Sequence, residues 1–136
     1  MATIDELGEA IKTRLETISG LRVSWLPPDS VNLPQAIIMP GNGAYHVRPG
    51  DGQSVTFSIV IYAASAQHGS NRGASTVLPY LDKSGDKSIK MALQKEKTLG
   101  GKASELHWRG WRDFDALKDY NGQEYWGAII DIEVRD

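Results

Sequence analysis

Few residues in this chain have the types and spacing that a metal site requires. The three histidines, His46, His68 and His107, are far apart in the sequence. Glu105 and His107 are two residues apart in a predicted strand, so their side chains would share one face and could supply two ligands. Because a metal site needs three or four suitably placed donors, and no third donor is near, we predict no metal site and no cofactor.

Other arrangements that could perform chemistry are also incomplete. Residues 41–46 begin like a phosphate-binding loop, but the later glycine is missing and no helix N-terminus follows. Asp113 and Asp115 would share one face of a strand, as paired catalytic carboxylates do, yet acid–base catalysis needs a pocket that separates their pKa values. Their position near a turn favours solvated side chains, and no strand–Gly-x-Ser-x-Gly–helix elbow is present. We therefore predict that the protein is not an enzyme.

Composition indicates one domain covering residues 1–136. Hydrophobic residues make up 40% of the chain and charged residues 24%, which is ordinary for a globular protein. The net charge of −2 argues against a dedicated nucleic-acid binder, and the absence of cysteine excludes disulfides. We expect neither a signal peptide nor a membrane span, because no basic leader or long apolar run is present.

The charges are unevenly distributed along the chain. Residues 83–102 contain six lysines, whereas residues 103–136 contain eight carboxylates and four basic residues. Such runs are typical of solvated faces. A second interpretation is that they form complementary edges of neighbouring subunits, since charges at the rim of an interface set its register.

Periodicity predicts an α+β fold with the element order αβββααββ. In it, about three helices pack against a mainly antiparallel or mixed sheet of four to five strands. The first helix is predicted over residues 3–19, because Thr3 and Glu6 have capping-box spacing and apolar residues then recur every three or four positions. Gly20 ends it. A short strand over 21–25 follows.

Two further strands are predicted to pair as a hairpin, over residues 36–39 and 55–63. Pro40 and Gly41 are expected to end the first of them. The intervening residues, 41–54, are rich in glycine and proline and are predicted to form a long loop, which in a compact domain is functional or mobile.

Two helices and a second hairpin complete the prediction. One helix is expected over 70–81, kinked or shortened by Pro79, and the next over 86–95 with Ser84 as its cap. The last two strands are joined at Asn121–Gly122, a strong turn signal. A strict two-residue turn would put carboxylates on the apolar face, so we expect a bulge or wider loop near residues 114–120.

Tryptophan placement indicates a candidate contact surface. Leu106, Trp108 and Gly110 are predicted to share one face of a strand. Trp108 and Trp111 cannot share a face if the strand is regular, so we expect one of these two to be exposed. An exposed tryptophan is a candidate interface anchor, because aromatic residues dominate interface hot spots.

Five segments, spread over nearly the full length, together carry a resemblance to a known family. They are Leu7-Gly8-Glu9-Ala10-Ile11, Pro27-Pro28-Asp29-Ser30-Val31-Asn32, Ala36-Ile37-Ile38-Met39-Pro40-Gly41, the helix of residues 84–93 with Thr98-Leu99-Gly100-Gly101, and Gly122-Gln123-Glu124-Tyr125-Trp126-Gly127-Ala128. With these segments, the chain resembles the tail terminator (tail completion) family of siphophages, as found in actinobacteriophages.

The resemblance implies a virion structural protein at the head-proximal end of the tail, assembled in the host cytoplasm. It implies a homo-oligomeric ring, a hexamer, that caps the tail tube, ends polymerisation of the major tail tube protein and docks the head or neck completion protein. DNA would pass through the bore without specific binding, and no membrane is involved.

No residue-level motif of that family transfers, so interface candidates follow from position alone. Tyr45, His46 and Arg48 lie at the centre of the 41–54 loop and could reach a neighbouring subunit or the tube. Trp111 is a candidate anchor. The acidic tip of residues 113–122 could line a bore or rim through Asp113, Asp115 and Asp119.

Two other functions remain open from the sequence. One is a head–tail connector or neck adaptor of a tailed phage. The other is a small enzyme or ligand-binding module with its site at the 41–54 loop, which would require an apolar pocket with converging polar groups.

Overall fold

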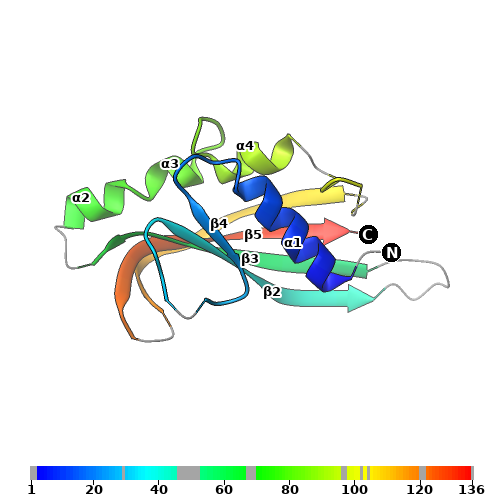
Figure 1. Ribbon diagram of the computed structural model, residues 1–136, viewed down its shortest axis with the longest axis horizontal. Helices are drawn as coiled ribbons and strands as arrows, with labels where there is room; N and C mark the ends of the chain where they lie inside the picture. Colours follow the sequence, from blue (N-terminus) through cyan, green and yellow to red (C-terminus); the bar gives the residue numbers. More distant parts are fainter. Residues whose placement is uncertain are drawn as a thin grey trace.

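A computed structural model describes residues 3–28, 30–45, 53–66, 70–95, 98–101, 103, 105–119 and 122–135. Its elements are α1 (Ile4–Leu15), β1 (Arg22–Trp25), β2 (Gln35–Tyr45), β3 (Gln53–Ser65), α2 (Ser70–Ser75), α3 (Leu78–Leu81), α4 (Ile89–Gln94), β4 (Glu105–Lys118) and β5 (Glu124–Arg135). The strands form one mixed sheet in the order β1-β2-β3-β5-β4. The helices gather on one side of it (Figure 1), so the predicted α+β class is confirmed.

Helix α1 begins with the predicted capping box. The Glu6 N–H donates to Thr3 Oγ1 at 3.1 Å, and the Thr3 N–H donates back to the Glu6 carboxylate at 3.5 Å. Leu7, Ile11 and Leu15 are fully buried along one stripe. The helix ends at Leu15, earlier than predicted, because residues 16–20 form turns that lead to Gly20 at φ +81°.

The helix predicted over residues 70–81 is divided in two. Residues 76 and 77 form a turn between α2 and α3. Pro79 stands in the first turn of α3, where its missing N–H interrupts no helical hydrogen bond. The predicted helix is therefore interrupted at residues 76 and 77, before Pro79, rather than kinked at the proline itself.

The predicted cap of the next helix was wrong. Ser88, not Ser84, is the N-cap of α4, because its hydroxyl accepts the Met91 N–H at 3.1 Å. The same hydroxyl donates to the carbonyl oxygen of Asp82, which joins the cap to the end of α3. Ser88 is buried and Ser84 is exposed.

The predicted hairpin of β2 and β3 is confirmed as an antiparallel pair, but Pro40 and Gly41 do not end its first strand. The strand continues to Tyr45 through an irregularity between Pro40 and Asn42. The Ile38 carbonyl accepts the last hydrogen bond from the β1 side, from the N–H of Leu26. Pro40, two residues later, points to the same side, where β1 has ended, so its missing N–H costs no ladder bond.

The main core lies between the helices and one face of the sheet. Its largest fully buried side chains include Phe57, Ile59 and Ile61 of β3, Ile130 and Ile132 of β5, Leu7 and Ile11 of α1, and Ile89 and Leu93 of α4. A smaller cluster covers part of the opposite face and is formed by Ile37, Val60, Tyr62 and Tyr125, with Val31 and Leu33 packed against it. Both faces of the central strands are thus partly covered.

Two bulges shape the β4–β5 hairpin. Arg109 is the extra residue of the first. In the second, Asp113 and Phe114 lie between paired Arg112 and Asp115, at the edge of the window predicted for a bulge. Gly110 was predicted to share the face of Leu106 and Trp108. That prediction was wrong, because the bulge places Gly110 on the other face. It pairs with Asp131, whereas Trp108 and Trp111 pair with Ile132 and Ile130 of the core face.

Candidate interaction surfaces

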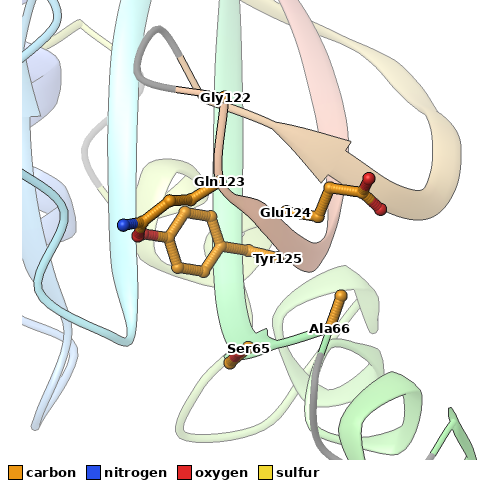
Figure 2. Close-up of a pocket in the computed structure, with 6 residues that line it drawn as sticks. All are labelled: Ser65, Ala66, Gly122, Gln123, Glu124 and Tyr125. Carbon is orange, nitrogen blue, oxygen red and sulfur yellow. The ribbon is translucent and has the colours of Figure 1, made fainter.

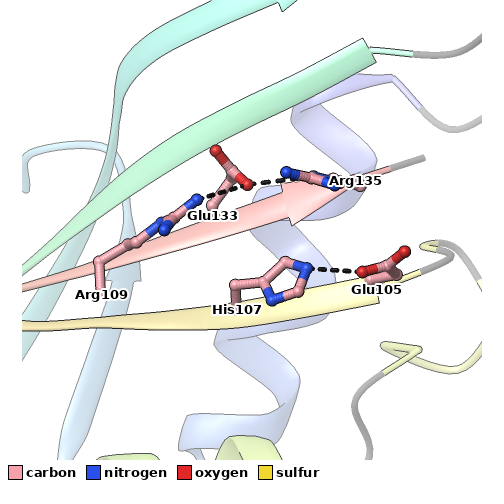
Figure 3. Close-up of polar contacts among 5 residues, drawn as sticks. All are labelled: Glu105, His107, Arg109, Glu133 and Arg135. Carbon is pink, nitrogen blue, oxygen red and sulfur yellow. Dashed lines mark hydrogen bonds and ion pairs between the residues drawn. The ribbon is translucent and has the colours of Figure 1, made fainter.

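The face of the sheet away from the helices carries rows of charged side chains, which we call the charged sheet face (Figure 3). Alternation along β4 and β5, together with the bulge at Arg109, brings these side chains to one side. The residues of the charged sheet face are Glu105, His107, Arg109, Arg112, Asp131, Glu133 and Arg135.

Glu133 is the centre of one row. Arg109 Nη2 donates to Glu133 Oε1 at 2.8 Å, and Arg135 Nε donates to the same oxygen at 3.1 Å. The Glu133 side chain is only 18% exposed. Partial burial would raise its pKa, but the hydrogen bonds and charges of the two arginines outweigh that effect and lower it. Glu133 is thus held as a carboxylate between two cations.

Arg112 is the centre of a second row. Its Nε donates to Asp131 Oδ2 at 2.7 Å and its Nη1 donates to Asp113 Oδ2 at 2.7 Å. The hydrogen bond to Asp131 is the largest of the influences that raise the pKa of Arg112. Asp131 also accepts a hydrogen bond from the Ser58 hydroxyl at 3.0 Å, which links β3 to the row.

The charged sheet face suits contact with a polar partner better than proton transfer. Its carboxylates are hydrogen-bonded to arginines or, at Glu105, lie 2.5 Å from the His107 ring. Among the described residues, no group of three or more histidine, cysteine or acidic side chains is arranged to hold a metal ion. His46 and His68 lie outside the described residues.

The outer edge of β4 displays an aromatic pair, which we call the β4-edge patch: Trp111 and Phe114. Trp111 is 52% exposed although it lies on the helix side of the sheet, and its ring meets Phe114 edge-on at 6.4 Å between centroids. Asp113 and Asp115 are exposed on the same edge. The structure therefore brings three predicted interface residues, Trp111, Asp113 and Asp115, to one edge.

The opposite edge of the sheet, at β1, displays aliphatic side chains, which we call the β1-edge patch: Ile4 and Leu26. Ile4 is 36% exposed and Leu26 is 44% exposed. A 2.7 Å hydrogen bond from Trp25 Nε1 to Asp5 Oδ1 holds their two segments together. Leu26 has φ +73°, a backbone conformation that is costly for a bulky residue.

A hollow of about 660 Å³ lies beside the start of β5 and is lined by Ser65, Ala66, Gly122, Gln123, Glu124 and Tyr125 (Figure 2). Burial is the main cause that raises the pKa of Tyr125, and Asp119 adds to it, so the phenol is neutral at neutral pH. Tyr125 donates its hydroxyl to Gln123 Oε1 at 2.6 Å, whereas the Glu124 carboxylate points away from the ring. Among the described residues that line the hollow, Tyr125 and Glu124 are thus not arranged as an acid–base pair.

The two regions predicted for contacts lie at opposite ends of the sheet. Tyr45 is the last residue of β2 and pairs with Gln53. It lies at the same end of the sheet as the paired residues Arg135 and Glu105. Asp119 follows β4 at the other end, where its carboxylate accepts the Gln123 N–H at 3.0 Å. His46 and Arg48 lie outside the described residues. The hollow beside Tyr125 is at the far end of β3 from the 41–54 segment.

Sequence reasoning missed the arginine–carboxylate rows. The signal was the alternation of Asp131, Glu133 and Arg135 in β5, but their partners in β4 depend on the bulge at Arg109.

In the part of the chain that the structure describes, no helix has the length and apolar character needed to cross a membrane. No protein-family model matches this chain, and no curated protein sequence matches it.

Proposed function

We propose that this protein is a structural subunit of a tailed bacteriophage, which assembles into a ring that caps the tail tube and ends its polymerisation. The sequence resemblance to siphophage tail terminators motivates the proposal. The observation that carries it is the presence of exposed apolar side chains, Trp111 and Leu26, at the two opposite open edges of one sheet. Such side chains favour contacts with other protein surfaces.

The charged sheet face supports the same role. Its arginines and carboxylates neutralise one another and lie on strands rather than in a cavity. A partner that docks there meets a fixed pattern of charge, which sets register more than affinity. We assign this face to contact with the tube protein or the head completion protein.

The acidic hairpin tip is consistent with a bore through which DNA moves. Asp119 directly follows β4, and Glu124 begins β5. Carboxylates repel the phosphate backbone and offer none of the Lys/Arg neutralisation that underlies non-specific DNA binding. DNA would therefore pass without being held.

Antibody labelling of virions, of isolated tails and of tail-less heads tests the proposal by electron microscopy. We expect label at the head-proximal end of tails, including tails that have never joined a head. Label that stays on tail-less heads and is missing from free tails would contradict it and assign the protein to the neck as a connector. Antibody against the tube protein provides the control for access.

A further inference from the structure

We propose that neighbouring copies of this chain join head to tail through opposite edges of their sheets. The β4-edge patch of one copy packs against the β1-edge patch of the next. The inference rests on the ring-forming part of the proposed function and names the surfaces that build the ring. It does not depend on what the ring binds.

The two edges differ in shape and chemistry, which favours a head-to-tail contact. β4 is a 14-residue strand with an aromatic pair, whereas β1 has four residues and an aliphatic patch. A two-fold contact would pair each edge with itself and leave the other edge open. A contact between unlike edges repeats from copy to copy and closes into a ring when the rotation allows.

The faces of the sheet also match across the proposed contact. Trp111 lies on the helix side of β4, opposite Ile130. On the other edge, Ile4 begins α1, the helix that covers β1 on that same side. If the sheet of one copy continues into the next, the indole of Trp111 therefore comes to the side on which Ile4 lies, and Leu26 directly follows β1 on the same edge.

On the opposite face of the sheet, each of the two edges carries a charged residue. Asp115 pairs with Gly127, and Arg22 pairs with Gln35, so both face away from the main core. Asp115 accepts only its neighbour's backbone N–H, from Ala116 at 2.8 Å, and Arg22 donates to the Leu33 carbonyl. Neither makes an ion pair among the described residues, so each is available to the other.

The spacing allows the apolar and the charged contact to form together. Arg22 and Leu26 are four residues apart on one edge, and Trp111 and Asp115 are four residues apart on the other. Four residues of extended chain span about 13 Å, somewhat less across a bulge. Each edge thus presents one apolar and one charged residue at a similar separation, and the charges on the two edges have opposite signs.

Backbone conformation marks the same two places. Three non-glycine residues of the described chain have positive φ, and two of them are Leu26 at +73° and Asp113 at +56°. Such conformations persist where the surroundings impose them, and they cluster at functional positions. Here one is at Leu26, which directly follows β1, and the other is at Asp113, in the bulge between Trp111 and Asp115.

Thiol cross-linking of the purified protein tests the contact, because the natural chain has no cysteine. Arg22→Cys and Asp115→Cys are introduced together and also separately. With a short cross-linker, we expect the double variant to give a ladder that ends in one closed ring. The two single variants, when mixed, should give dimers only, and each alone should remain monomeric. Asp115→Cys combined with Ser84→Cys is the control and should give at least tenfold less product.

A second arm tests the apolar contact. Trp111→Ser in the double-cysteine background should lower cross-linking at least tenfold, whereas Leu78→Ser, at an exposed residue of α3 outside both patches, should not. Thermal melting verifies that each variant is folded.

Dimers from Asp115→Cys alone would overturn the proposal in favour of a two-fold contact. A double variant that cross-links no better than the Ser84 control would also overturn it. These outcomes concern the contact alone, because no tube is present. A ring that forms through these edges but leaves tube growth unchanged would refute the tail function and keep the contact.

Discussion

The indole ring of Trp25 occupies the space where a side chain on Gly8 would stand. A Cβ at Gly8 would come within 2.5 Å of Trp25 Cδ2, far inside van der Waals contact. The ring also lies 5.8 Å from Phe57 between centroids, and its N–H donates to Asp5. This packing seats α1 directly on β1 and brings the first turn of α1, with Ile4, to the β1 side of the sheet.

Replacing Gly8 by alanine tests this packing. In an ordinary helix interior the change stabilises a protein by up to about 1 kcal/mol. Here the rigid ring must move, so we expect the free energy of unfolding to fall by about 1–3 kcal/mol, as for overpacked cores. Thr13→Ala, at an exposed position of the same helix, should change it by less than about 0.5 kcal/mol. Urea unfolding measures both; a Gly8→Ala protein more stable than the wild type would contradict the packing.

The cap of α4 gives a second prediction. Ser88→Ala removes both the acceptor for the Met91 N–H and the donor to the Asp82 carbonyl, at a buried site. We expect a loss of about 1–2 kcal/mol in stability. Ser84→Ala provides the matched control and should be nearly neutral. Equal effects of the two substitutions would show that the helix begins elsewhere.

The lowered pKa of Glu133 predicts a pH dependence of stability. Because the folded pKa lies below the unfolded value of about 4.3, the stabilisation is fully present above that value and is lost as the pH falls through the folded pKa. Glu133→Gln should therefore cost about 1 kcal/mol at pH 7, and this cost should shrink as the pH falls through the folded pKa. Denaturant unfolding across this range measures it. Glu16→Gln, at an exposed position, is the control; a cost for Glu133→Gln that is the same at all pH values would exclude the charge as its cause.

Element types and their order were predictable because each is a local property of the sequence. The alternation in β3, the capping box at Thr3 and the break before Pro79 all depend on neighbouring residues. The end of β2 was not predictable in this way. Whether Pro40 interrupts a strand depends on whether β1 still runs beside it, which is a long-range relationship.

The candidate contact surfaces were predictable only in part. Trp111 and the acidic residues beside it were recognised from residue type, and the structure places them on an edge strand. The faces they occupy depend on the bulges at Arg109 and at Asp113–Phe114, which shift the register by one residue each time. Without that register, the partners of Glu133 and Asp131 could not be assigned.

Polymerisation of the tube protein encoded by the same genome tests the central claim most directly. Purified tube protein is allowed to elongate with and without this protein, and tube length and tube ends are recorded by electron microscopy. We predict that growth stops and that one end of each tube bears a ring. Tubes that elongate unchanged, with bare ends at every concentration of this protein, would contradict the account.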